Sequence, residues 1–462
     1  MSTRSNDAPL MLSISGMRGL VGRSLTPTVA ARFAAAYGTW LHTNRRPGHD
    51  PTSPPIVALG RDSRASGQML EAAAAAGLAS VGCRVVRVGV LSTPGVAIAM
   101  DHLAGDGGMV ITASHNPFPW NGIKPLRYDG VAPPPDQSHA IIDRFKRDDV
   151  SFAEVAAIRP ISDFAEGVSV HVDRVLERVD ADLIRGAGLS CVVDSVHGAG
   201  GDEARALLDA LGVRVTHLFA EPTGHFPHTP EPTKENLVEL SEQTARAGAD
   251  VGFAQDPDAD RLAIVDEQGR YIGEEYTLAL CAKHKLGPGE GVAANLSTSR
   301  MVDDVAQAIG GFVVRTAVGE ANVTAGMRER GCTLGGEGNG GIIDNRVSQV
   351  RDSLIGMAYI LEMLAAEKKT LSAIVAAMPA YAIVKDKADI DPAVLQTMPD
   401  KMRAAFADQR IDDQDGIRVD WDNHWVHVRP SNTEPIIRII AEAEREADAK
   451  GLVALVRRVL GL

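Results

Sequence analysis

Along the first third of the chain, short apolar runs alternate with longer segments in which apolar residues recur every three or four positions. The short runs have the length of buried strands, and the longer segments have the period of amphipathic helices. The pair Thr26-Pro27 is a typical start signal for the first of these helices. The pattern predicts strands over 56–59, 84–88 and 109–112, and helices over 28–40, 68–81 and 94–103.

The same alternation of strands and helices returns twice more. This order is typical of a parallel or mixed sheet covered by helices, so we expect three related α/β units. In each unit the last strand leads into a loop of unusual composition. The second set comprises strands 190–194, 213–218 and 250–254 with helices 202–211 and 234–247; the third comprises strands 291–295, 312–316 and 332–335 with helices 274–284, 300–309 and 322–330.

The pattern changes after about Tyr381. Three short strands follow one another here without a helix between them, unlike the strands of the three preceding sets. We therefore expect a smaller α+β domain at the C-terminal end. Its predicted elements are helices 392–406 and 445–459 and strands 417–421, 424–428 and 436–441.

The overall composition is that of an ordinary soluble protein, and 462 residues are too many for a single core. The 60 acidic and 47 basic residues give a net charge of −13 without a long basic run, which argues against nucleic acid or an anionic membrane as a partner. The four cysteines are widely spaced and predict buried thiols. The N-terminus has no apolar signal region, so we expect a cytoplasmic protein.

The strand predicted at 109–112 runs into the turn Ser114-His115-Asn116-Pro117. Proline has no N–H for a sheet ladder, so the strand must end and leave the Ser114 hydroxyl on a loop. Taken alone, this sequence is also compatible with an ordinary polar turn after a buried strand. The other loops favour a functional role for Ser114.

Three aspartates, Asp256, Asp258 and Asp260, alternate along the second of these loops. In an extended segment their side chains would project to one side and converge on a cation, and oxygen ligands of this kind suit Mg²⁺. Arg261 stands where an EF-hand loop requires glycine, which excludes that motif. A solvated acidic turn is the alternative, but the flanking apolar strands favour a metal.

The third loop, 336–341, combines glycines with one carboxylate, Glu337, and one amide, Asn339. Glycine allows a ligand to approach closely, and the two side chains suit vicinal hydroxyls or an amine. A glycine-rich turn without a ligand is the alternative.

A loop near the C-terminus, 429–435, combines Arg429 with hydroxyl and amide groups, and Arg438 follows shortly after it. Arginine binds phosphate in a bidentate manner, so this segment is a candidate phosphate clamp. A hairpin turn with an incidental arginine is the alternative.

Two further arginines, Arg18 and Arg61, lie in segments that we interpret as turns. The segment 15–19 would place Arg18 on a flexible turn, where we favour a functional role. For Arg61 we favour a structural role, with an internal ion pair to Asp62.

Together these stretches resemble the α-D-phosphohexomutase family. The resemblance extends over nearly the whole chain, with the motifs in family order. It rests on Ser15-Gly-Met-Arg-Gly, Gly60-Arg-Asp-Ser-Arg, Thr112-Ala-Ser-His-Asn-Pro, Asn121-Gly-Ile-Lys, Asp256-Pro-Asp-Ala-Asp-Arg, Gly336-Glu-Gly-Asn-Gly and Arg429-Pro-Ser-Asn-Thr-Glu-Pro.

The resemblance implies an α/β fold of four domains around a central cleft: three related units with mixed sheets and a smaller C-terminal α+β domain. With the pattern above, we place the domains at 1–160, 161–267, 268–378 and 379–462.

The resemblance also implies the roles of the site residues. Ser114 would carry the transferable phosphoryl group, and one Mg²⁺ would be held by that phosphoserine with Asp256, Asp258 and Asp260. A sugar 1,6-bisphosphate would serve as intermediate and activator. Arg18 and Arg261 would neutralise charge, Lys124 and then His115 are the acid/base candidates, Glu337 and Asn339 would bind the sugar, and Arg429, Ser431, Asn432, Thr433 and Arg438 would bind the distal phosphate.

Two positions depart from the family pattern. Gly341 stands where many members have a histidine, and Asn432 stands where glycine is common. The third loop looks most like that of the phosphoglucosamine mutase branch and of the related phosphomannomutase/phosphoglucomutase branches. We expect conversion of glucosamine 6-phosphate to glucosamine 1-phosphate, with mannose or glucose phosphates as the next candidates and a metal-dependent sugar phosphatase as a remoter one. A homodimeric assembly is left open.

Overall fold

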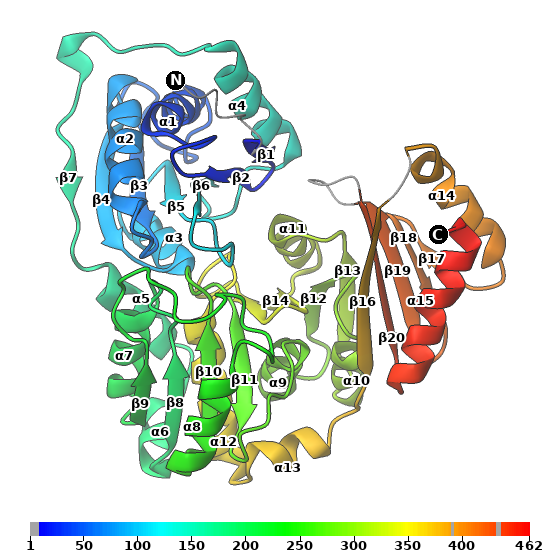
Figure 1. Cartoon of the computed structure of the whole chain (residues 1–462). Helices are drawn as coiled ribbons and strands as arrows, with labels where there is room; N and C mark the ends of the chain where they lie inside the picture. Colours follow the sequence, from blue (N-terminus) through cyan, green and yellow to red (C-terminus); the bar gives the residue numbers. More distant parts are fainter. Residues whose placement is uncertain (1–8, 390–391, 431–435) are drawn as a thin grey trace, which may run out of the picture. The chain divides into compact units, whose positions relative to one another are not determined.

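The computed structural model describes residues 9–389, 392–430 and 436–462. The chain divides into two compact units. Unit 1 contains the residues up to Thr277 together with Gly340–Ser372, and unit 2 contains Leu278–Asn339 and Ala373–Leu462. Figure 1 shows the chain coloured along its sequence.

The first sheet of unit 1 has seven strands in the order β1-β2-β6-β5-β3-β4-β7. β3 pairs in parallel with both β4 and β5, whereas β5, β6, β2 and β1 pair in antiparallel fashion, so the sheet is mixed. Its strands are β1 (Met11–Ser13), β2 (Gly16–Leu20), β3 (Ile56–Arg61), β4 (Arg84–Val90), β5 (Gly107–Ile111), β6 (Trp120–Arg127) and β7 (Ser162–Asp163).

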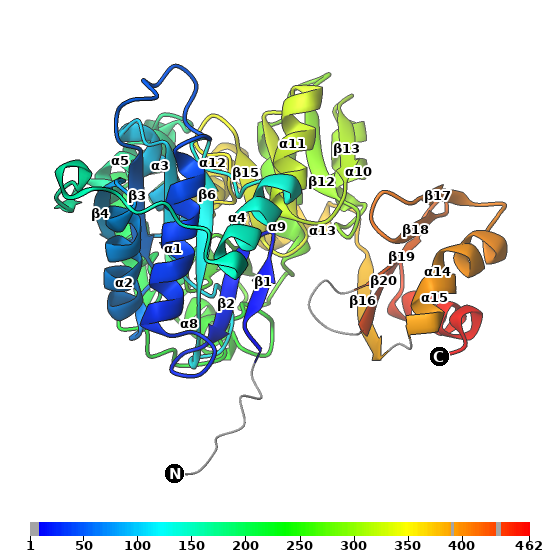
Figure 2. The same cartoon turned by 90° about the horizontal axis from the view of Figure 1, so that it is seen from above.

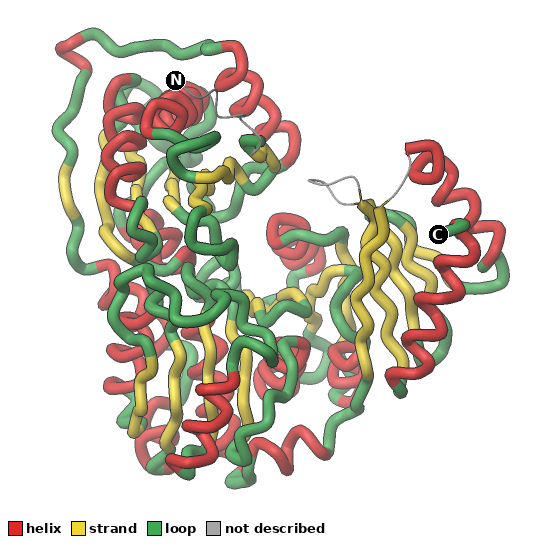
Figure 3. Tube along the Cα trace, viewed as in Figure 1, coloured by secondary structure: helices red, strands yellow, loops and turns green. Residues whose placement is uncertain are grey.

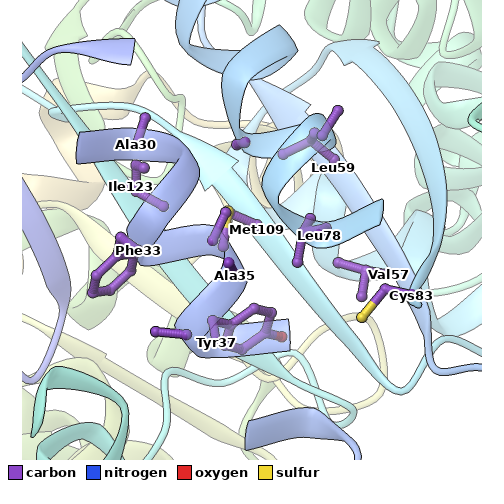
Figure 4. Close-up of a cluster of buried hydrophobic side chains, with 14 of the residues drawn as sticks. Ala30, Phe33, Ala35, Tyr37, Val57, Leu59, Leu78, Cys83, Met109 and Ile123 are labelled. Carbon is purple, nitrogen blue, oxygen red and sulfur yellow. The ribbon is translucent and has the colours of Figure 1, made fainter. Parts of the chain in front are cut away.

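Two apolar clusters cover the two faces of this sheet. One is formed by side chains of α1 and α2 with Leu59 and Met109, and Figure 4 shows it in close-up. The other is formed by α3 with Ala58 and Val110, which are the strand neighbours of Leu59 and Met109 and therefore point the opposite way. The helices of this region are α1 (Pro27–Leu41), α2 (Gly67–Ser80), α3 (Thr93–His102) and α4 (Pro135–Arg147), with a 3₁₀ turn η1 (Val155–Ala157).

The first helix begins as its sequence signal predicts. The Thr26 hydroxyl accepts a hydrogen bond from the Val29 N–H, and Pro27 occupies the first turn. Figure 2 shows α1 and α2 side by side in unit 1.

The second sheet of unit 1 has four strands in the order β11-β10-β8-β9. β8 pairs in parallel with β9 and β10, and β10 and β11 form an antiparallel hairpin. Figure 3 shows irregular segments of unit 1 gathered between its two sheets. The elements are β8 (Ser190–Asp194), β9 (Arg214–Leu218), β10 (Val251–Gln255), β11 (Leu262–Asp266), α5 (Gly167–Leu176), α6 (Ala181–Ala187), α7 (Gly201–Ala210), α8 (Val238–Ala247) and the long buried helix α12 (Ser353–Glu367).

A third sheet has the order β13-β12-β14-β15, in which β12 pairs in parallel with β13 and β14. Its helices and strands follow one another in the order predicted for the third set. The elements are β12 (Gly291–Asn295), β13 (Phe312–Thr316), β14 (Leu334–Glu337), β15 (Gly341–Asp344), α9 (Glu275–Lys285), α10 (Met301–Ala308), α11 (Glu320–Arg330) and α13 (Leu371–Ala376).

The C-terminal sheet, in unit 2, is antiparallel throughout, in the order β16-β20-β19-β18-β17. Helices α14 and α15 pack on it around an apolar cluster of their own, which confirms the predicted change of architecture. The elements are β16 (Ala382–Asp389), β17 (Arg410–Asp412), β18 (Ile417–Asp420), β19 (Trp425–Pro430), β20 (Ile436–Ala443), α14 (Pro392–Ala405) and α15 (Glu446–Leu460).

Two sequence-wide expectations can be checked on the described residues. All four cysteines are buried thiols, as their spacing predicts. Within the described ranges, every helix is too short or too polar to cross a bilayer.

Candidate functional site

Ser114 lies in the loop that follows β5, and its side chain is almost completely buried. Its backbone has φ = 48°, a left-handed conformation that a non-glycine residue adopts only when its surroundings hold it there. The Thr112 hydroxyl accepts a hydrogen bond from the Ser114 N–H at 2.9 Å, and it donates to Asp62 at 2.7 Å. The loop is therefore fixed from the strand side.

Arg64 holds the other side of this loop. Its guanidinium donates to the carbonyls of Ser114 and Asn116, each at 2.6 Å. It also donates to the carbonyls of Pro117 at 3.1 Å and Trp120 at 3.0 Å. Arginine can make these bonds at once because its five N–H groups point in fixed, divergent directions.

The ion pair predicted between Arg61 and Asp62 is wrong. Asp62 is completely buried and pairs with Arg64 at 3.0 Å, whereas Arg61 pairs with Glu71 at 3.2 Å. Arg61 ends β3, so its side chain lies along the start of α2, and Asp62 begins the loop that turns back toward Arg64. The sequence pattern predicted no role for Arg64, because its partners are carbonyls about fifty residues away and leave no mark on the sequence.

The three aspartates of the second loop meet at one point. Asp256, Asp258 and Asp260 are buried, and one carboxylate oxygen of each lies within 4.8 Å of the other two. The loop is a tight turn between β10 and β11, with Ala259 at φ = 51°, rather than the extended segment that we expected. The three carboxylates therefore converge as predicted, but a turn and not an extended segment brings them together.

The aspartate cluster has the properties of a cation site. Burial, followed by the charges of Asp258 and Asp260, raises the pKa of Asp256 well above its ordinary value. Among the described residues, Asp258 Oδ1 and Asp260 Oδ1 are buried and make no hydrogen bond. Buried oxygens that repel one another and lack donors fit a bound divalent ion, so these residues could hold a metal.

The structure brings Ser114 to this cluster across 142 residues of sequence. The Ser114 hydroxyl donates to Asp256 Oδ2 at 3.0 Å. A hydroxyl in this place is within reach of any ion that the three carboxylates hold.

Positive charge surrounds the same point. The backbone N–H of Arg261 donates to Asp256 at 3.1 Å, and its guanidinium lies 4.0 Å from Asp260. Arg18 donates to Asn116 at 2.7 Å. Burial lowers the pKa of Arg18 from its ordinary value, and the Asp258 carboxylate works against that shift.

We expected Arg18 to lie on a flexible turn, and this expectation is wrong. Arg18 belongs to β2, where it is paired with Met11 of β1 and Gly122 of β6. Glycine is depleted in strands. This glycine-rich segment is nevertheless a short strand, because β1 and β6 pair with its two edges.

His115 follows the serine, and its Nδ1 lies 3.3 Å from Ser114 Oγ. Burial, and then the charges of Arg261 and Arg18, lower the pKa of His115 to about 2. The ring is therefore neutral at ordinary pH.

Lys124 reaches the cluster from β6. Its Nζ lies 3.8 Å from Asp260 Oδ2, and only 14% of its side chain is exposed. β6 was not among the predicted strands, yet it lies antiparallel to β5 and carries Lys124 back toward the carboxylate loop.

Two contacts to the aspartate loop were not predicted from the sequence. The Thr93 hydroxyl donates to Asp258 Oδ2 at 2.7 Å, and the Arg351 guanidinium donates to Asp260 Oδ2 at 2.6 Å. Burial raises the pKa of Asp260, but Arg351, Lys124 and Arg261 outweigh it and lower that pKa to about 2. Both residues stand at helix starts, marked by Ser92 before α3 and Asp352 before α12, and these cap signals were the available clue.

The third loop lies in unit 2 for most of its length. Glu337 ends β14, and its carboxylate accepts hydrogen bonds from Asn295 at 2.8 Å and from the Gly319 N–H at 3.1 Å. Asn339 Nδ2 lies 3.4 Å from the same carboxylate, and the Gly338 N–H donates to Thr298 at 3.0 Å. The side chains of Glu337 and Asn339 are thus within 3.4 Å of each other.

Arginines of unit 2 support the segment that carries these partners. Arg315 donates to the carbonyls of Asn295 at 3.0 Å and Thr298 at 2.8 Å, and Arg418 donates to the Leu296 carbonyl. Hydrogen bonds from arginines to carbonyls therefore hold the segment after β12, as they do the Ser114 loop.

The C-terminal candidates are only partly described. Ser431, Asn432 and Thr433 lie outside the described residues. Arg429 of β19 pairs with Asp415 at 3.2 Å and is the register partner of Arg438 on β20. Lys387 of β16 is the next partner of Arg438, so three cations stand in a row across the sheet. Like charges placed directly opposite one another repel, and an anion would relieve this repulsion.

Four family models match the chain in succession. All are described as phosphoglucomutase/phosphomannomutase: α/β/α domain I matches residues 11–151, domain II 169–269, domain III 274–381, and the C-terminal domain 380–459.

Relatives agree with these models. A probable phosphoglucosamine mutase of Methanopyrus kandleri is 39% identical over 96% of this chain and 97% of its own, and a phosphoglucomutase/phosphomannomutase of Thermococcus kodakarensis is 36% identical over 95% and 96%. A crystal structure of a family protein from Burkholderia thailandensis superposes with a TM-score of 0.85 at 28% identity, covering 97% of this chain and 98% of that one. The chain therefore belongs to the phosphoglucomutase/phosphomannomutase family, the α-D-phosphohexomutases.

Proposed function

We propose that this phosphohexomutase moves a phosphoryl group between the 6- and 1-positions of a hexose phosphate through a phosphorylated Ser114. The observation that carries the proposal is the position of the Ser114 hydroxyl, 3.0 Å from Asp256 at the mouth of a buried carboxylate cluster. A phosphate on this oxygen would find both ion ligands and arginines within the same unit.

Asp256, Asp258 and Asp260, together with the phosphate on Ser114, are the residues that would hold one Mg²⁺. When bound, this ion would withdraw negative charge from the transferring group. The two buried oxygens without hydrogen-bond donors support this assignment. Magnesium accepts a small set of oxygen ligands and commonly takes phosphate oxygens as well.

The chain's own residues account for the transfer. The bond between Ser114 Oγ and phosphorus breaks while a substrate hydroxyl oxygen bonds to phosphorus, and the hydroxyl proton finally returns to Ser114 Oγ. Lys124 is the proposed carrier of that proton, because its amine reaches the cluster from β6. Arg18 and Arg261 neutralise the transferring phosphoryl group.

His115 takes a secondary place in this scheme. A neutral imidazole with a strongly lowered pKa cannot serve as a general acid near neutral pH. It remains able to accept or donate one hydrogen bond to the Ser114 oxygen.

The product of the first transfer is a sugar 1,6-bisphosphate, which must present its other phosphate to Ser114. Glu337 and Asn339 would bind the sugar hydroxyls or amine. Arg429 and Arg438, with Ser431, Asn432 and Thr433, would bind the phosphate that is not reacting. The row of cations on the C-terminal sheet supports this role.

The proposed sugar is glucosamine phosphate. Support comes from the acceptor oxygens of Glu337, which suit an amine, and from the relative named a probable phosphoglucosamine mutase. Phosphomannomutase or phosphoglucomutase activity is the alternative, because another relative of similar identity carries those names. The four domains are proposed at 1–160, 161–267, 268–378 and 379–462.

A coupled assay tests the proposal. Glucosamine, N-acetylglucosamine, glucose and mannose phosphates are compared with a trace of sugar 1,6-bisphosphate as activator. We expect isomerisation of all active sugars to need the activator, and glucosamine 6-phosphate to react fastest. Equal rates on all four sugars would contradict the proposed substrate, and release of inorganic phosphate without isomerised sugar would contradict the mutase activity.

A further inference from the structure

A histidine that the proposed reaction does not use, His171, is completely buried between two carboxylates. Its Nδ1 lies 2.7 Å from Glu203 Oε1, and its Nε2 lies 2.8 Å from Asp352 Oδ2. Glu203 and Asp352 are themselves buried. The ring thus joins α5, α7 and the start of α12 in the interior of unit 1.

A carboxylate at each ring nitrogen favours a charged ring. Ionised carboxylates accept hydrogen bonds, and a ring that donates from both nitrogens to them is an imidazolium. Burial lowers the pKa of His171, but the Asp352 and Glu203 carboxylates outweigh that effect and raise it to about 10. Three charged groups are costly to bury unless close pairing and hydrogen bonds offset the loss of water, as the contacts of 2.7 and 2.8 Å do here.

Glu203, His171 and Asp352 form a buried triad. Hydrogen bonds connect its Glu203 end to Asp258. Glu203 Oε2 accepts a hydrogen bond from the Ser92 N–H, and Oε1 accepts one from the Ser92 hydroxyl, both at 2.8 Å. The next residue, Thr93, binds the aspartate loop twice: its N–H donates to the Asp258 carbonyl at 2.9 Å and its hydroxyl to Asp258 Oδ2 at 2.7 Å. Glu203 therefore sets the position of a direct support of Asp258.

The other end leads to Asp260. Asp352 caps α12 by accepting the Leu354 N–H at 2.8 Å. Its two sequence neighbours touch the aspartate loop, because Arg351 donates to Asp260 Oδ2 at 2.6 Å and the Ser353 hydroxyl donates to the Ala259 carbonyl at 2.7 Å. Asp352 thus sets the position of both contacts.

We propose that His171 is a positioning residue for the aspartate loop: it ties Glu203 to Asp352 and so holds the two supports of Asp258 and Asp260 at a fixed separation. Without the imidazolium, two buried carboxylates would repel each other, and the supports would separate. The inference rests on the proposed function only for the statement that the loop binds a divalent ion.

Two independent substitutions test this role. His171→Gln keeps a hydrogen-bonding side chain but removes the positive charge. Gly95→Ala leaves His171 unchanged and acts on its partner, because a Cβ at Gly95 would lie 2.4 Å from Glu203 Oε1 and would displace that carboxylate. Leu240→Ala is the control, since it creates a cavity in the apolar cluster under the second sheet without touching the triad.

The probe is Mn²⁺, whose binding to the full-length protein is measured by electron paramagnetic resonance. We expect both triad variants to bind Mn²⁺ about 10-fold more weakly or worse, which is the usual effect of removing a group that orients metal ligands. Leu240→Ala should lower the melting temperature without changing the Kd for Mn²⁺. This difference separates positioning from general destabilisation.

The outcomes distinguish the inference from the proposed function. Wild-type protein that binds Mn²⁺, with unchanged affinity in a folded His171→Gln or Gly95→Ala variant, would overturn the inference alone. Equal weakening in Leu240→Ala would also overturn it, because the effect would then be general. Wild-type protein that binds no Mn²⁺, or binding that survives Asp258→Ala, would overturn the metal site itself.

Discussion

At the scale of single residues, three carboxylates that repel one another dominate the electrostatics of the site. Because the pKa of Asp256 is raised, the stability of the metal-free protein falls as the pH rises above the ordinary pKa of an aspartate. Folding thus brings the three aspartates close together, and a bound cation would reduce their mutual repulsion.

Removing the charge of Asp256 should relieve this repulsion. Asp256→Asn should stabilise the metal-free protein at neutral pH, because the amide carries no charge for Asp258 and Asp260 to repel. It should also lower the Mg²⁺-dependent activity by at least 10-fold, because one ligand loses its charge. Chemical denaturation with a chelator present and a Mg²⁺ titration of activity measure the two effects. A metal-free variant that is less stable than the metal-free wild type would contradict the proposed repulsion among the aspartates.

The second prediction concerns Arg64, which holds four carbonyls of the Ser114 loop. Arg64→Ala should destabilise the protein by about 3–5 kcal/mol, because Asp62 would be left as a buried and unpaired charge. Urea denaturation measures this loss. Arg87→Ala is the matched control, since its ion pair with Asp163 is exposed and should contribute less than about 1 kcal/mol. Similar losses in the two variants would argue against the loop-holding role.

At the scale of elements, His171 links α5 to α7 and α12, and its raised pKa predicts a pH dependence of stability. Between pH 7 and 8.5 the unfolded histidine is neutral whereas the folded one keeps its proton. The free energy of unfolding should therefore fall by up to about 1.4 kcal/mol for each pH unit that is gained. The contribution is fully present below the unfolded pKa and is lost as the pH rises through about 10.

Denaturant unfolding of wild type and His171→Gln across this range measures the difference. The window stops at pH 8.5 because the buried thiol of Cys83, whose pKa burial raises to about 12, adds a loss of its own at higher pH. Parallel pH profiles of the two proteins would contradict a charged His171.

The hydrophobic pattern predicted the strands and helices that alternate regularly, and it missed those that depend on their neighbours. β6 contains Pro125 and two charged side chains, and it is a strand because β2 and β5 pair with its two edges. α12 is buried on nearly all sides and therefore lacks an amphipathic period. The residue types of the loops predicted their chemistry. The residues that hold these loops, such as Arg64 and His171, were not predicted, because their partners lie far away in the sequence.

At the scale of the whole molecule, the two units carry different parts of the proposed reaction. Unit 1 contains Ser114, the aspartates and the cations around them, and unit 2 contains Glu337 and the row of cations on the C-terminal sheet. We therefore expect variants of unit 2 to change sugar binding and leave metal binding unchanged.

Arg438→Ala tests this division. It should raise the KM for the sugar phosphate by about 10- to 100-fold, because a hydrogen bond to a charged group contributes about 1.5–3 kcal/mol. The affinity for Mn²⁺ should not change. A weaker affinity for Mn²⁺ in this variant, or an unchanged KM, would show that the division of roles is wrong.

The central claim is that Ser114 carries the phosphoryl group. Incubation with a sugar 1,6-bisphosphate, followed by mass spectrometry of the intact protein and of its peptides, tests it directly. We expect one phosphoryl group per chain, on the peptide that contains Ser114, and its loss when hexose monophosphate is added. A Ser114→Ala variant that still isomerises the sugar, or a phosphoryl group found only elsewhere in the chain, would contradict it.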